Sequence, residues 1–174
     1  MANRDLANGF EAVGTLSGAK LPGPTAFNSA GGQTWKVGAV ARLVSGQAVN
    51  PTTTAGSLLG VVAPQQGIGR LGSTCIASAT TNQDVMIYAG DDIVFQGQSS
   101  GTATSVMVGL LCDWVGAAGA QEVATATSTE SVFCVRELVV GPTESRGVQA
   151  IGANSLVRFT IAKCQVGAHP DSTT

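Results

Sequence analysis

Residues 156–161 read LVRFTI, and the segment alternates apolar with polar side chains. In a β-strand, successive side chains point to opposite faces, so this alternation places Val157, Phe159 and Ile161 together on one face. Arg158 and Thr160 fall on the other. The segment is therefore predicted to be a strand with one face on a hydrophobic core and the other toward water or a neighbouring molecule.

Similar short runs of apolar and β-branched residues recur along the chain, each bounded by Gly, Pro, Asn or clusters of Ser and Thr. They are Thr34–Val44, Leu58–Ala63, Asp84–Tyr88, Asp92–Gln96, Ser105–Val115, Ser131–Val140 and Leu156–Val166. Helical periodicity is not found in any stretch that is also free of Gly, Pro and β-branched runs. The pattern predicts an all-β fold, an antiparallel β-barrel or sandwich of about seven strands.

The turn Ala89-Gly90-Asp91-Asp92 separates two of these runs and predicts a tight hairpin. Two adjacent carboxylates at a turn can hold Mg²⁺, and the segment resembles the hairpin that carries paired aspartates in viral RNA polymerases. A polymerase does not fit in 174 residues. Asp91 and Asp92 are therefore interpreted as turn residues.

The first 33 residues differ from the rest because their apolar residues are isolated and follow no period. Such a segment cannot build its own core. We therefore predict an extended N-terminal arm over residues 1–33, a β domain over residues 34–166, and a flexible C-terminal tail over residues 167–174.

Charge is scarce, with 9 Lys or Arg, 11 Asp or Glu and a net charge of −2. Charged residues make up 11% of the chain, against about 25% in a typical soluble domain. Neither a basic stripe for nucleic acid nor an apolar run long enough to cross a membrane is present in the sequence. The beginning of the chain lacks the apolar core of a secretion signal, which makes the cytoplasm the expected place of synthesis.

No cofactor or metal site is expected. Cys75, Cys112, Cys134 and Cys164 are far apart in the sequence and only one His is present, so the cysteines are predicted to be buried, reduced thiols. The segment Gly67–Gly72 matches the Gly-x-Gly-x-x-Gly dinucleotide fingerprint, but the residues after it do not favour the helix that this motif requires. It is interpreted as a flexible loop.

Catalysis is not expected either, since His169, next to Pro170 in the tail, has nothing to orient its ring. A glycosidase-like pair remains open among Asp84, Asp91, Asp92, Asp113, Glu122, Glu130, Glu137 and Glu144. Trp35 and Trp114 are predicted to be core or subunit-contact residues, with a carbohydrate-binding module as the alternative.

Several segments together resemble the head-decoration, or capsid cement, proteins of tailed bacteriophages. They are Met1–Asp5 with Gly9, Phe10 and Val13, then Val37–Leu43 with Gly46, Ala48 and Val49, then Leu59–Ala63, Val85–Tyr88 with Asp92–Gln96, and Leu156–Ile161 with Gln165 and Val166. The chain departs from the family pattern at Ala39, where an Asp is usual, and at Gly90-Asp91-Asp92, which lacks the usual Pro. Residues 97–129 do not align.

The resemblance implies a non-enzymatic virion protein that binds the outer surface of the expanded shell and stabilises it, often as a homotrimer. Its partners would be the major capsid protein and copies of itself, and assembly would take place in the host cytoplasm. We expect residues 2–16 to contact the shell or a neighbouring subunit, through Asn3, Arg4, Phe10, Val13 and Leu16. The alternatives are another phage β-module, such as a tail-tube, head-completion or fibre protein, and the carbohydrate-binding module.

Overall fold

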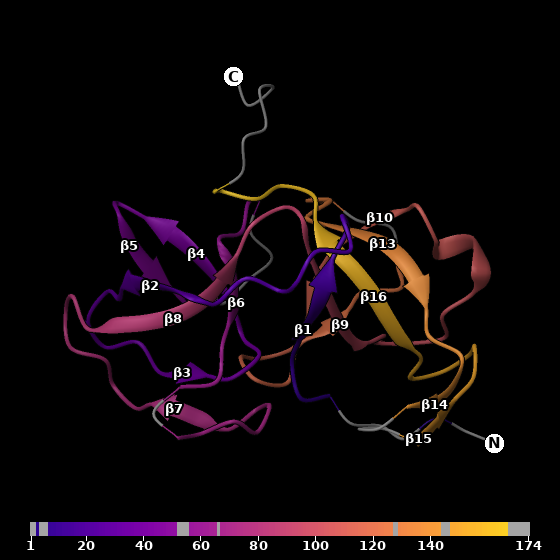
Figure 1. Cartoon of the computed structure of the whole chain (residues 1–174), viewed down its shortest axis with the longest axis horizontal. Coiled ribbons are helices and arrows are strands. Elements are labelled where there is room, and N and C mark those ends of the chain that lie inside the picture. Colours follow the sequence, from indigo (N-terminus) through magenta and orange to yellow (C-terminus); the bar gives the residue numbers. More distant parts are fainter. Residues whose placement is uncertain are drawn as a thin grey trace.

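The computed structural model describes residue 3 and residues 7–51, 56–65, 67–126, 129–143 and 147–166. These residues form an all-β structure built on two five-stranded antiparallel sheets that lie side by side (Figure 1). The predicted fold class is confirmed in its sandwich-like form. A single turn of 3₁₀ helix, η1 (Ser105–Met107), is the one helical element in the described part of the chain.

The first sheet has the order β1-β9-β16-β13-β10. Its strands are β1 (Glu11–Thr15), β9 (Ile93–Gln98), β16 (Leu156–Ile161), β13 (Phe133–Leu138) and β10 (Leu111–Cys112). The alternating segment is its central strand. Val157, Phe159 and Ile161 are buried on one face of β16, as predicted, because the apolar side of every neighbouring strand meets them there.

The second sheet has the order β2-β8-β6-β4-β5. Its strands are β2 (Thr25–Asn28), β8 (Asp84–Ala89), β6 (Gly60–Val62), β4 (Val40–Val44) and β5 (Gln47–Val49). A bridge between Ser29 and Ala48 brings its two edges together. Three two-stranded pairs complete the fold: β3 (Trp35–Lys36) with β7 (Thr74–Ile76), β11 (Trp114–Val115) with β12 (Glu122–Val123), and β14 (Gly141–Thr143) with β15 (Gly147–Gln149).

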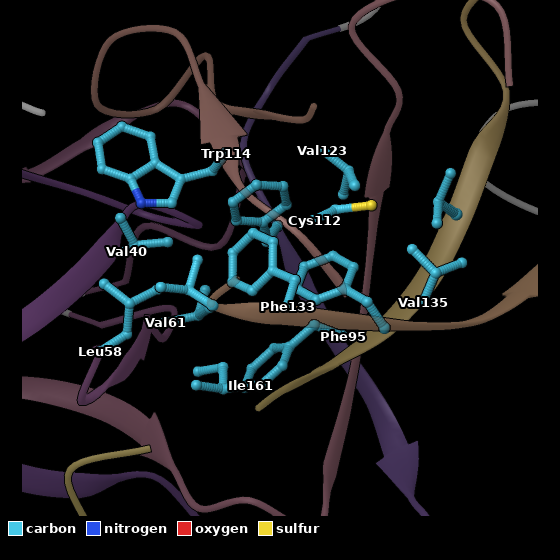
Figure 2. Packing of buried hydrophobic residues seen from close by; sticks show 14 of the residues in the cluster. Val40, Leu58, Val61, Phe95, Cys112, Trp114, Val123, Phe133, Val135 and Ile161 are labelled. Carbon is cyan, nitrogen blue, oxygen red and sulfur yellow. The ribbon is translucent and has the colours of Figure 1, made fainter. Parts of the chain in front are cut away.

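The core consists of two hydrophobic clusters that share the strands β4 and β6. Val40 and Val61 point into the first cluster, beside the buried face of the first sheet (Figure 2). Ala41 and Val62, one position further along the same strands, belong to the second cluster. Both faces of these two strands are therefore covered, which fits their mainly apolar sequences, in which Arg42 is the one charged residue.

The predicted hairpin at residues 89–92 is wrong. β8 belongs to the second sheet and β9 to the first, so the turn carries the chain from one sheet to the other. Gly90 has a φ of 147°, a conformation that L side chains rarely adopt. The carbonyl of Asp92 accepts a hydrogen bond from the backbone N–H of Leu16 at 2.8 Å, which fixes this crossing against the end of β1.

The separate N-terminal arm is also not found in residues 7–33. β1 pairs with β9, and β2 pairs with β8, so this stretch supplies an edge strand to each sheet. Phe10 lies in the first cluster, and its backbone N–H donates to the carbonyl of Gly38. One large aromatic anchor and backbone pairing hold the segment, and neither produces a periodic pattern. The predicted tail lies outside the described residues.

Candidate interaction surface

The exposed face of the first sheet carries two β-bulges. In β1, Val13 is an extra residue between Ala12 and Gly14, which pair with β9. In β13, Arg136 is an extra residue between Val135 and Glu137, which pair with β16. Bulges bend a strand and redirect side chains, and they occur preferentially at sheet edges and next to functional sites. Here they turn Val13 and Arg136 toward the same exposed face.

A polar row crosses this face over four strands. Gln96 on β9 donates from Nε2 to Glu11 on β1 at 3.1 Å, and its Cα partner in the neighbouring strand is Arg158. Arg158 in turn forms an ion pair with Glu137 on β13, with 2.9 Å between Nη1 and Oε2. The row links the strands at the surface. Because both members of the ion pair are exposed, we expect it to contribute at most about 1 kcal/mol to stability.

Two adjacent hollows lie beside this row, with volumes of about 470 and 430 Å³. They share Leu16 and Arg136 in their linings. The first is lined by Val13, Gly14, Thr15, Leu16, Val94, Arg136, Glu137 and Arg158, and the second by Leu16, Asp91, Asp92, Arg136, Thr160, Ile161 and Ala162. We call this surface, from the polar row to the Asp91–Asp92 turn, the bulge face.

A second exposed surface runs along η1 and β10, at the edge of the first sheet opposite β1. Val106, Val108, Leu110 and Leu111 are all exposed, with 73% of Val106 and 52% of Leu110 accessible to solvent. Met107 is the buried anchor of this segment, and Gly109 donates its N–H to the carbonyl of Val135 on β13. We call these four exposed residues the apolar edge. An exposed apolar cluster of this kind is typical of protein–protein contact sites.

The structure separates the five residues predicted to contact a partner. Val13 and Leu16 are exposed and line the bulge face, whereas Phe10 is buried in the core with 1% of its surface accessible. Asn3 is engaged within the chain: its amide bonds the backbone at Ala150 and Ala153. Arg4 lies outside the described residues.

Other residues singled out in the sequence have structural partners. The carboxylate of Asp92 accepts hydrogen bonds from the backbone N–H and the hydroxyl of Ser17. The buried carboxylate of Asp113 accepts from the backbone N–H groups of Thr129, Glu130 and Ser131. Trp35 donates from Nε1 to the hydroxyl of Ser29 at 2.8 Å.

Neither Trp35 nor Trp114 presents its indole at the surface, since both are buried, in agreement with the prediction that they belong to the core. The Gly67–Gly72 segment is followed by strand β7, so no helix begins where the dinucleotide motif requires one. Within the described residues no cluster of three or more His, Cys, Asp or Glu side chains forms a metal site, and His169 and Glu144 lie outside them.

All four thiols are free, but only two are fully buried. Cys75 and Cys112 are buried, as predicted, whereas Cys134 and Cys164 are partly exposed. Burial raises the pKa of the Cys112 thiol, and the charges of Asp113 and Cys134 raise it further. Burial is also the main cause of the raised pKa of Cys164, although backbone hydrogen bonds oppose it in part. Both groups therefore favour the protonated, less reactive thiol.

The bulge face could have been found only in part from the sequence. Val13 and Leu16 stood out as isolated apolar residues, whereas Arg136 did not. The available signal was the pair Arg136-Glu137, two consecutive charges inside an otherwise alternating strand, which is what a bulge produces. The apolar edge was read as part of one long strand, Ser105–Val115.

The chain matches no family model, no curated protein and no solved structure. Among the described residues, none of the helical segments is long and apolar enough to span a membrane.

Proposed function

We propose that this protein is a structural virion component that decorates the outer surface of a tailed-phage capsid and stabilises the shell. Its partners are the major capsid protein and further copies of itself, arranged as trimers on the lattice. The apolar edge is the observation that carries this proposal. The sequence resemblance to decoration proteins supplies the class of partner.

The apolar edge is suited to docking on a large protein surface. Val106, Val108, Leu110 and Leu111 lie within six consecutive positions, and the segment holds no charged residue. Burying apolar surface is worth about 25 cal/mol per Å², so covering four such side chains contributes several kcal/mol to binding. Charged residues are depleted at the centres of protein interfaces, and this segment has that composition.

The low charge of the whole chain supports the same function. Long charged side chains lose about 1.5–2 kcal/mol of rotamer entropy each when they are ordered in a contact. A surface rich in Gly, Ala, Ser and Thr avoids much of this cost. On a lattice with many copies, modest contacts also add through multivalency.

The proposal is tested with expanded, undecorated tailed-phage shells assembled from major capsid protein. The protein should appear as regular density over the outer surface in subnanometre images. Removing residues 1–30 is not a suitable test, because β1 and β2 would be lost with them. The double variant Val106→Ser/Leu110→Ser changes only exposed side chains and should bind shells at least tenfold more weakly.

Val44→Ser is the matched control, since Val44 is also an exposed valine but lies on β4, at the other end of the molecule from β10 (Figure 1). It should decorate shells normally. Equal decoration by the double variant, or shells without regular outer density, would contradict the proposal. Density confined to the tail of complete virions would favour the tail-tube or fibre alternative. Glycan binding by the unmodified protein, with no affinity for shells, would favour the carbohydrate-binding alternative.

A further inference from the structure

The bulge face holds an unusual share of the charge of this chain. Of nine basic and eleven acidic residues, six lie on or beside it. They are Glu11, Asp91, Asp92, Arg136, Glu137 and Arg158. Among the apolar side chains, Leu16 lines both hollows, and Val13 and Val94 line the first. The face thus combines apolar side chains with charges of both signs.

These charges are only partly satisfied within the chain. Arg158 pairs with Glu137, but Arg136 uses only its Nε, which donates to the hydroxyl of Thr160 at 3.1 Å. In the described part of the chain, the two Nη groups of Arg136 have no acceptor and the carboxylate of Asp91 has no donor. Both residues line the same hollow, yet they form no ion pair there.

We propose that the bulge face binds the bulge face of a second copy of this chain through a two-fold contact. In such a contact, one patch meets itself and residue i of one copy faces residue j of the other, and the reverse. The patch must therefore be complementary to itself. Arg136 and Arg158 of one copy would face Asp91 and Asp92 of the other, while the Val13 and Leu16 side chains meet near the axis.

Both bulges fit this occupant. They turn Val13 and Arg136 outward at the same surface, and an isolated soluble domain gains nothing evident from exposing an extra valine beside an incompletely bonded arginine. A threefold ring would require two different patches on each copy. The two-fold contact would therefore join copies from neighbouring trimers, or two single chains in solution.

The contact is expected to be weak. Four neighbouring strands are about 15–20 Å across and six residues of strand are about 20 Å long, so the flat area is roughly 300–400 Å². A stable interface buries about 800 Å² of surface on each partner. Self-association should therefore appear at high protein concentration, and it should depend on salt because it joins exposed charges of opposite sign.

The first test is sedimentation velocity and static light scattering over a range of concentrations. At low ionic strength, the smallest species should associate with a doubling of mass. The Debye length falls from about 30 Å at 0.01 M to about 3 Å at 1 M salt, so the high-salt condition should weaken association roughly tenfold. A mass that never doubles would overturn the proposal.

The sharper test exchanges the charges. Arg136→Glu faces Asp91 of the second copy with like charge, and Asp91→Lys faces Arg136 in the same way, so each variant alone should associate at least tenfold more weakly. An equimolar mixture should recover association, because the new glutamate of one variant then faces the new lysine of the other. The unchanged Arg136 and Asp91 face each other in the same mixed pair. The double variant should also recover association.

Asp84→Lys is the matched control for Asp91→Lys, because it makes the same change in charge at an exposed residue at the start of β8, in the second sheet. It should associate like the unmodified protein. Association that persists in both single variants would overturn the proposal. If Arg136→Glu and Asp91→Lys lose shell binding while their self-association is unchanged, the proposal is also overturned, and the bulge face is assigned to the contact with the shell. The proposed function is tested separately, through the apolar edge.

Discussion

Gly97 leaves open the space that the ring of Phe10 occupies. A methyl group at Gly97 would come far inside van der Waals distance of Cδ1 and Cε1 of that ring. The ring is held on its other sides, because its centroid lies 5.3 Å from that of Phe133 and 5.0 Å from that of Phe159. The N-terminal segment is thus fixed to the core through one glycine on β9.

Gly97→Ala should destabilise the protein by about 1–3 kcal/mol, since the added methyl group overpacks a filled core. The melting temperature should fall by about 2–4 °C per kcal/mol in a chain of this size. Gly14→Ala is the control, because nothing lies within 4 Å of a Cβ at that position, and it should change stability little. A double variant with Phe10→Leu should be less destabilised than the sum of its single changes. Additive losses would show that the two residues do not compete for space.

The carboxylate of Asp113 should stabilise the segment that leads into β13. Its oxygens accept hydrogen bonds from the N–H groups of Thr129, Glu130 and Ser131 at 3.0, 3.2 and 2.8 Å. Asp113→Asn replaces one acceptor oxygen with a donor, so at least one partly buried N–H loses its partner, at a cost of about 1 kcal/mol. Urea unfolding measures the loss. Asp84→Asn, at an exposed position, should stay within about 0.5 kcal/mol of the unmodified protein.

Periodicity found the strands in which alternation and burial agree, and β16 is the best example. It did not find β1 or β2, because β1 is an edge strand with a bulge and β2 has one partly buried side chain, Phe27. Whether β8 and β9 pair with each other depends on which sheet each strand joins, and the residues of the turn between them do not determine this. Phe10 was identified as an anchor, but its site is the core, a distinction that depends on the space at Gly97.

Alkylation of Cys112 and Cys164 should require a higher pH than alkylation of an unperturbed thiol. The raised pKa values of Cys112 and Cys164 mean that the thiolate is less favourable in the folded protein than at the ordinary value of 9.0. The raised thiol pKa values therefore contribute to the free energy of unfolding. This contribution is fully present below pH 9.0 and is lost as the pH rises through the pKa of the thiol in the folded protein. Peptide-mapped alkylation should therefore be slow at both sites at neutral pH and should continue to rise above pH 9.0. In urea, both sites should react like free thiols. Equal rates in folded and unfolded protein would contradict the assignment.

Asn3 should hold the loop between β15 and β16, because its side-chain amide makes three hydrogen bonds to the backbone of that loop. Nδ2 donates to the carbonyls of Ala150 and Ala153 at 2.7 and 2.8 Å, and Oδ1 accepts from the N–H of Ala150 at 2.9 Å. Asn3→Ala removes all three bonds, and a local loss of about 1–2 kcal/mol corresponds to roughly 5–30-fold faster hydrogen exchange at Ala150. Asn3→Asp retains the acceptor and should leave the Ala150 N–H partly protected, while the N–H of Phe10 should be unchanged in both variants. Unaltered exchange at Ala150 in Asn3→Ala would mean that this side chain does not hold the loop, and Asn3 would again be available for the contact with a partner that its position near the N-terminus first suggested.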